Sequence, residues 1–252
     1  MADFVAGGSG NEATLRANEE GWNNYTLWPR VLVDVRETNP GVTIFGRRPT
    51  APILVSPMGI HCLVDPAGEL ASAAAARHAG LGYDASPASS IDLEETAEIA
   101  PDCRWLQVCW LRDRDVVADL IQRAQAAGYT GICLTVDAPV DGARLRDRRN
   151  GFAVSEGIRF ANLERYGFAP AAHSTGHAVR YIVDEVDPSV TWQDLAWLAN
   201  NATSLSSSRV SSTRPTSPRP NFGAPTRSVS RPPWSPTRPH SSRRMRAGES
   251  DS

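Results

Sequence analysis

Short apolar runs alternate with longer amphipathic segments between residues 50 and 200. The runs read APILVSP (51–57), LGYDAS (81–86), RWLQVCW (104–110) and GICLTVD (131–137). Each run holds about four to six residues of strand-like character, which is typical of a buried strand. Strands that alternate with helical patterns form parallel sheets, so the pattern predicts an α/β fold.

The segments between these runs place apolar residues at helical spacing. They read PAGELASAAAARHAG (66–80), SIDLEETAEIA (90–100) and DRDVVADLIQRAQAAG (113–128), and TWQDLAWLANNAT (191–203) follows later. Gly80 and Gly128 stand where a helix would end in a left-handed residue. The strand-to-strand repeat of about 25 to 30 residues fits a (β/α)8 TIM barrel better than a Rossmann sheet. About four βα units are visible, whereas a closed barrel requires eight.

The composition changes abruptly after residue 203. Residues 204–252 hold nine arginines against Glu249 and Asp251, a net charge of +7, so residues 1–203 carry −9 of the overall −2. This tail also holds 14 serines and eight prolines and few large apolar residues. Such a segment cannot offset the entropy lost on ordering, so we predict that 204–252 is disordered and that 1–203 forms the folded part.

The cysteines and the amino-terminal sequence indicate a cytoplasmic protein. Cys62, Cys103, Cys109 and Cys133 match no metal or redox spacing, which is typical of reduced, mostly buried thiols. The opening MADFVAGGSGNE lacks the pattern of a secretory leader. No apolar run approaches the roughly 18 residues that a membrane span requires.

Chemistry in parallel α/β proteins lies where the strands end at their carboxyl edge. The residues that close the predicted strands are Pro57, Met58, Gly59, Ser86, Gln107, Cys109, Thr135 and Asp137. A carboxamide inside an apolar strand costs about 1 to 3 kcal/mol if unpaired, so Gln107 requires either a partner in the core or a ligand. Thr135 and Asp137 share one face of their strand, although Asp137 could equally be a capping residue.

Charged side chains crowd the segment after the fourth run. APVDGARLRDRRNGF (138–152) places four arginines, including Arg144, in a predicted loop. Each could be a solvated charge, but a guanidinium at a barrel mouth also matches a carboxylate substrate. His173 and His177 are four residues apart in a loop-like context, which argues against a metal site, and we predict none.

Four stretches together resemble the FMN-dependent α-hydroxy acid dehydrogenase/oxidase family, which includes glycolate oxidase and lactate oxidase. They are PILVSPMGIHCLVDPAGELASAAAARHAG, ASPASS, WLQVCWLRDRDVVADLIQRAQAAGY and LTVDAPVDGARLRDRRNGF. The opening VAGGSGNEATLRAN is similar to the lactate 2-monooxygenase branch. The resemblance covers about residues 3 to 203. It implies a (β/α)8 barrel that holds FMN at its mouth and oxidises an L-2-hydroxy acid to a 2-oxo acid or its decarboxylated product.

The resemblance also implies roles for individual residues. Pro57, Met58 and Gly59 would contact the flavin ring through the main chain. Ser86, Gln107 and Thr135 would hydrogen-bond the isoalloxazine, which gives Gln107 its partner. Arg144 would bind the substrate carboxylate, and Asp137 would orient the catalytic histidine. Phe4 and Cys109 stand where the family has two substrate-contacting tyrosines, so two hydroxyl groups are lost.

The later motifs of the family have no counterpart in this sequence. These motifs are the lysine of the fifth strand, the histidine base with its arginine, and the FMN phosphate loops. SSSRVSSTRP (206–215) can be encoded by codons that, read two bases later, give Leu-Val-Lys-Gly-Val-Leu-Asn-Ala-Ala, a family-like fifth strand. We therefore expect that a frameshift near residues 204–206 truncates the barrel.

The sequence predicts that this chain is inactive, with weak or absent FMN binding and poor solubility. Its expected substrate is a small 2-hydroxy acid, and family members are homo-oligomers. The alternative is a non-enzymatic protein whose basic tail binds nucleic acid or an acidic partner. That alternative is the weaker one, because an out-of-frame, GC-rich sequence also gives Ser, Arg and Pro.

Overall fold

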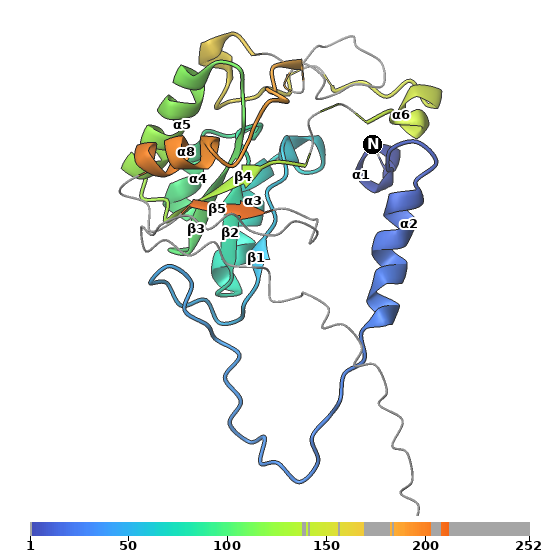
Figure 1. Cartoon of the computed structure of the whole chain (residues 1–252), viewed down its shortest axis with the longest axis vertical. Helices are drawn as coiled ribbons and strands as arrows, with labels where there is room; N and C mark the ends of the chain where they lie inside the picture. Colours follow the sequence, from blue (N-terminus) through green and yellow to red (C-terminus); the bar gives the residue numbers. More distant parts are fainter. Residues whose placement is uncertain are drawn as a thin grey trace, which may run out of the picture.

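A parallel sheet forms the centre of the protein. The computed structural model describes residues 2–137, 140, 142–155, 157–168, 182, 184–202 and 208–211. The strands are β1 (Leu54–Val55), β2 (Gly82–Ala85), β3 (Arg104–Cys109), β4 (Gly131–Thr135) and β5 (Ser208–Ser211). They lie in the order β1-β2-β3-β4-β5, and every neighbouring pair is parallel (Figure 1). Neighbours in sequence are thus neighbours in space, which confirms the predicted succession of βα units.

Helices connect the successive strands at the predicted positions. They are α3 (Gly68–His78), α4 (Leu93–Ile99) and α5 (Arg114–Ala126), and α8 (Asp194–Asn201) comes before β5. Gly80 and Gly128 follow α3 and α5 with φ of +67° and +75°. These positive φ values confirm that both glycines end their helices in the left-handed conformation that residues with a Cβ adopt only at a cost.

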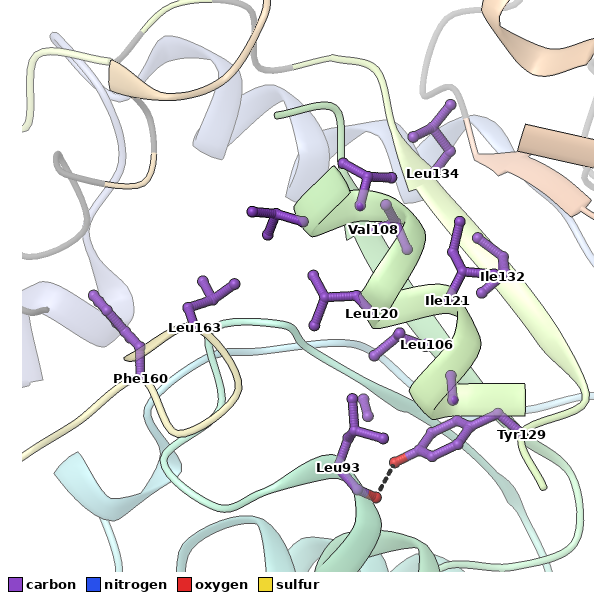
Figure 2. Close-up of a cluster of buried hydrophobic side chains, with 14 of the residues drawn as sticks. Leu93, Leu106, Val108, Leu120, Ile121, Tyr129, Ile132, Leu134, Phe160 and Leu163 are labelled. Carbon is purple, nitrogen blue, oxygen red and sulfur yellow. Dashed lines mark hydrogen bonds between the residues drawn. The ribbon is translucent and has the colours of Figure 1, made fainter. Parts of the chain in front are cut away.

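The apolar core lies between the sheet and its helices. Leu106 and Val108 of β3 and Ile132 and Leu134 of β4 are all 0% exposed. Figure 2 shows them beside Leu120 and Ile121 of α5. The Tyr129 hydroxyl donates a hydrogen bond of 2.9 Å to the Leu93 carbonyl at the edge of this cluster. The core explains why the strands read as apolar runs with polar residues at alternate positions.

The amino-terminal region lies apart from the sheet. It consists of α1 (Ala2–Ala6), α2 (Ala13–Glu20) and the 3-10 helix η1 (Gly21–Asn24). A long segment then leads to β1, and it exposes Leu27, Trp28 and Leu32. Helix α1 packs against α6 (Leu145–Arg149), which forms where the sequence predicted an arginine-rich loop. Two further 3-10 helices are η2 (His61–Leu63) and η3 (Glu164–Tyr166).

The structure changes the limits of the first strand and adds a fifth strand. The first strand is much shorter than residues 51–57, since β1 spans only Leu54–Val55. Residues Ser208–Ser211, near the start of the segment predicted to be disordered, form β5, and their main chain pairs with Ile132–Thr135 of β4. The unpaired edge of β4 offers backbone donors and acceptors to any extended segment that reaches it.

Some predictions concern residues that lie outside the described part. They include His173 and His177, and residues 212–252 of the predicted basic tail. Within the described residues, no helix is both long enough and apolar enough to cross a membrane.

Candidate active site

Most of the residues selected from the sequence lie at the carboxyl edge of the sheet. Pro57, Met58 and Gly59 follow β1, and Ser86 directly follows β2. Gln107 lies in the second half of β3, and Thr135 is the last residue of β4. Because all four strands are parallel, these positions come from the same edge of the sheet.

Gln107 and Thr135 form a direct contact across β3 and β4. The Gln107 side-chain nitrogen Nε2 donates a hydrogen bond of 2.7 Å to the Thr135 hydroxyl oxygen Oγ1. Both side chains are partly exposed and point away from the helices, since they alternate with the buried Leu106, Val108 and Leu134. Part of the polar capacity of Gln107 is therefore met within the protein, and its side chain still reaches the surface of the sheet.

Cys109 and Cys133 line the same face of the sheet. Cys109 is the register partner of Thr135, and Cys133 is that of Gln107. Burial of the sulfur raises the pKa of Cys109 to about 11, although a hydrogen bond with Thr135 opposes the shift. Burial is the largest cause that raises the pKa of Cys133 to about 12, and the charge of the nearby Asp84 carboxyl is the second. Both thiols are neutral near pH 7, which suits side chains that pack and does not suit nucleophiles.

Asp84 is a buried acid that the sequence analysis did not select. It lies in β2, is 5% exposed, and its Oδ1 has no hydrogen-bond partner in the described part of the chain. Burial raises the pKa of this carboxyl to about 7, while hydrogen bonds from Cys133 and the Gln107 main chain oppose the shift. The sequence did carry a signal for Asp84, because burial of an acid inside the run LGYDAS costs free energy just as burial of the Gln107 carboxamide does.

Close packing joins the loops after β1 and β2. The Ile60 amide donates to the Ala88 carbonyl at 3.0 Å, and a Cβ on Gly59 would lie 2.9 Å from that carbonyl oxygen. Only glycine allows this approach. Glu69 of α3 is 0% exposed, and its Oε1 accepts hydrogen bonds of 3.0 Å from the amides of His61 and Ser90. Glu69 was also missed, since one glutamate in a helical first turn carries no distinct pattern.

Ser86 takes part in the turn that follows β2. Its side chain is buried, and its hydroxyl accepts a hydrogen bond of 3.2 Å from the Ala88 amide. The Ser86 carbonyl accepts a bond of 2.7 Å from the Ser89 hydroxyl. These contacts fix the hydroxyl of Ser86 at the strand end. Met58 is different, because its side chain is 54% exposed.

A second cluster forms where α1 meets the segment around α6. The Arg144 guanidinium donates from Nε to the Asp147 carboxylate and from Nη2 to the Phe4 carbonyl. Its central carbon also lies 4.8 Å from the centroid of the Phe4 ring. The structure thus brings together Phe4 and Arg144, which are 140 positions apart in the sequence. Asp147, 1% exposed, is a partner that sequence reasoning did not identify.

Further contacts hold the amino-terminal segment against this cluster. Arg146 Nη2 donates to the Glu12 carboxylate at 2.6 Å, and the Asn150 side-chain nitrogen Nδ2 donates to the Asp3 carboxylate. The Gly10 amide donates to the Ala143 carbonyl at 2.8 Å. The hydrogen bond from Gly8 is the first cause that lowers the pKa of Glu12, and Arg146 adds to it. Charged pairs therefore place the amino-terminal segment beside the residues that follow β4.

Asp137 occupies a different setting from the one expected of a buried orienting carboxylate. It lies two residues beyond β4, and its side chain is exposed. Asp137 takes part in an interaction in this structure. Its side chain is exposed, whereas those of Gln107 and Thr135 are partly buried. Its role stays a prediction.

The comparisons with known proteins agree on one family. The model of the family described as FMN-dependent dehydrogenase matches residues 1–205. The L-lactate oxidase of Nostoc sp. is 40% identical over 202 residues, which cover 78% of this chain and 55% of that protein. The 4-hydroxymandelate oxidase of Amycolatopsis orientalis is 42% identical over 197 residues, with 77% and 54% covered.

The solved structures support the same assignment. A crystal structure of mandelate oxidase with (S)-4-hydroxymandelic acid superposes with a TM-score of 0.76 at 39% identity. The match covers 82% of this chain and 58% of the mandelate oxidase chain. The chain therefore spans about half the length of the relatives it matches. On the family match, the relatives and the shared fold, the chain belongs to the FMN-dependent dehydrogenase family and has the first strands and helices of its TIM barrel.

Proposed function

We propose that the chain is the amino-terminal half of an oxidoreductase that uses FMN to oxidise a small 2-hydroxy acid to a 2-oxo acid. The observation that carries the proposal is the Gln107–Thr135 pair at the carboxyl edge of β3 and β4, in a chain of this family. The names of its relatives, L-lactate oxidase and 4-hydroxymandelate oxidase, support 2-hydroxy acids as the substrate class.

The polar groups at the strand ends fit the edge of a flavin ring. That edge carries alternating donors and acceptors, and the Gln107 carboxamide offers both, as do the hydroxyls of Ser86 and Thr135. The main chain of Pro57 and Met58 would form one side of the site. Next to it, Gly59 lies close to Ala88 because it has no side chain. When bound, FMN would take up the two electrons that the hydroxy acid loses. These residues would bind and orient the ring.

Four further residues complete the proposed active site. Arg144 would pair with the substrate carboxylate, and Asp147 and the Phe4 carbonyl already fix the direction of its guanidinium. Phe4 and Cys109 would lie near the substrate without the hydroxyl groups of tyrosines. Asp137 would orient the histidine base of a complete enzyme.

We propose that this chain does not catalyse oxidation of the 2-hydroxy acid. Removal of the substrate hydroxyl proton requires a base within hydrogen-bond reach, and no described residue near Arg144 is a histidine. The family match ends at residue 205, within a few residues of the change in composition. A frameshift near 204–206 accounts for both observations, and determination of the nucleotide sequence around codon 205 tests it. If the redetermined bases encode residues 204–252 in the same reading frame as residues 1–203, the frameshift is not a sequencing error. A frameshift mutation in the genome would then remain.

A flavin titration of the purified chain tests the proposed site. The change in flavin fluorescence is measured with FMN and with riboflavin, which lacks the phosphate. We expect weak binding of equal strength for both, because only ring contacts are present, and we expect Gln107→Leu to weaken it further. Reduction of added FMN by a 2-hydroxy acid, above the rate without protein, would contradict the proposed lack of turnover.

Two further expectations belong to this proposal. Assembly into homo-oligomers, as in related enzymes, is checked by light scattering coupled to size-exclusion chromatography. A cytoplasmic location is checked by fractionation of the source cells.

A further inference from the structure

The surroundings of Arg144 point to a particular kind of 2-hydroxy acid. The rings of Phe4 and Phe152 stack with their centroids 4.5 Å apart and their planes at 12°. Both side chains are partly buried and pack against the apolar core. Since Phe4 belongs to α1 and Phe152 follows α6, the pair exists only because these two segments meet.

The guanidinium of Arg144 lies directly beside this aromatic pair. It is held by the Asp147 carboxylate at Nε, by the Phe4 carbonyl at Nη2 and by the face of the Phe4 ring. No hydrogen bond to Nη1 is found among the described residues, so one edge of the guanidinium remains for a ligand. A guanidinium fixed in this way loses little entropy when it binds a carboxylate.

We propose that the Arg144, Phe4 and Phe152 cluster selects 2-hydroxy acids that carry an apolar group of aryl size over those that carry hydrogen or methyl. The inference rests on the proposed function, because it assumes that Arg144 binds the substrate carboxylate. A carboxylate on the guanidinium lies about 2.9 Å from its nitrogens, so the group on the next carbon comes within reach of the aromatic pair. Phenylalanine offers that group an apolar surface and no hydroxyl to a small polar acid.

Binding to the full-length chain tests this selectivity without turnover. The dissociation constants of (S)-mandelate, (S)-lactate and glycolate are measured by isothermal titration calorimetry. Burial of part of a phenyl group predicts that mandelate binds about tenfold more tightly than glycolate. Phe4→Leu preserves the main-chain carbonyl that orients Arg144, and it should reduce this ratio to about threefold or less. Its lactate and glycolate affinities should stay within about twofold.

Two arginine variants separate the inference from the proposed function. Arg144→Gln should abolish binding of all three acids, whereas Arg149→Gln, which removes an exposed charge at the end of α6, should leave every affinity within about twofold. Equal affinities for the three acids that still depend on Arg144 would overturn the selectivity and leave the carboxylate role intact. An equal preference for mandelate in wild type and Phe4→Leu would show that the aromatic pair does not cause the selectivity, and it would also overturn the inference. Absence of binding by any acid would overturn the carboxylate role itself, and the selectivity with it.

Discussion

The leucine, valine and isoleucine side chains of β3 and β4 that point toward the helices are fully buried, whereas the polar and thiol side chains near the carboxyl ends on the opposite face are partly exposed. Leu106 and Leu134 are both 0% exposed. On the same strands, Gln107, Cys109 and Thr135 reach the surface. In a closed barrel the second set would face the interior and be covered by the remaining strands.

This difference shows that the two layers of a βα-barrel depend on different parts of the chain. Each strand and its following helix complete the outer apolar layer locally, because they are adjacent in sequence. The inner layer requires strands from the whole ring. The polar side chains proposed to contact FMN lie in the inner layer, so a chain with only these strands retains a well-packed core but lacks part of the proposed site.

Asp84 gives the largest expected effect, since it is a buried acid on the inner face. Its pKa of about 7 is above the ordinary 3.8, so the folded chain binds this proton more tightly than the unfolded chain. The contribution of Asp84 to stability should be complete below about pH 4, fall as the pH rises to about 7, and stay level beyond. Asp84→Asn should abolish this slope and raise the free energy of unfolding at pH 8 by as much as about 4 kcal/mol.

Urea denaturation of wild type and Asp84→Asn at several pH values checks the prediction. Asp65→Asn is the matched control, because Asp65 is exposed beside α3. Slopes that remain the same in Asp84→Asn would show that another group sets the pH dependence.

Leu106→Ala tests the outer layer. Removal of a fully buried leucine side chain leaves a cavity between β3 and α5 and should lower the free energy of unfolding by about 3 kcal/mol. Cys109→Ala on the same strand changes a partly exposed inner side chain and should cost less than about 1 kcal/mol. Chemical denaturation measures both changes. Equal losses in the free energy of unfolding would show that the two layers do not differ in packing.

Asp113→Ala tests how well the outer layer is held at a helix end. The Asp113 carboxylate caps α5 by accepting hydrogen bonds of 2.9 Å from the Asp115 amide and 3.4 Å from the Val116 amide. Loss of the cap should cost about 1 kcal/mol in thermal or urea unfolding. Asp115→Asn, which leaves the cap in place, should change stability by only about 0.3 kcal/mol. Equal losses in both would show that charge and not capping is responsible.

Thr135→Val gives the smallest expected effect. It removes the acceptor of the Gln107 hydrogen bond, but water can replace that acceptor at a partly exposed position. The free energy of unfolding should therefore change by about 0.5 kcal/mol or less, as urea denaturation would show. A loss above about 2 kcal/mol would indicate that the inner face is shielded from water, contrary to the comparison of the two layers.

The sequence by itself determined β2, β3 and β4 and the helices α3, α4, α5 and α8. Apolar runs became β2, β3 and β4 with small changes in their limits, and Gly80 and Gly128 ended their helices. Both depend on local properties, namely the periodicity of side chains along the backbone and the conformational freedom of glycine. The alternation within β3 also placed Gln107 and Cys109 on one face.

The tertiary structure decided which of these residues meet. The pairing of Phe4 with Arg144 and the hydrogen bond of Arg144 to Asp147 have no signature in the spacing of the sequence. The composition of the tail did not predict the strand at Ser208–Ser211 either, because this strand depends on hydrogen bonds with β4. Contacts between distant segments depend on the packing of the whole chain, which local periodicity does not encode.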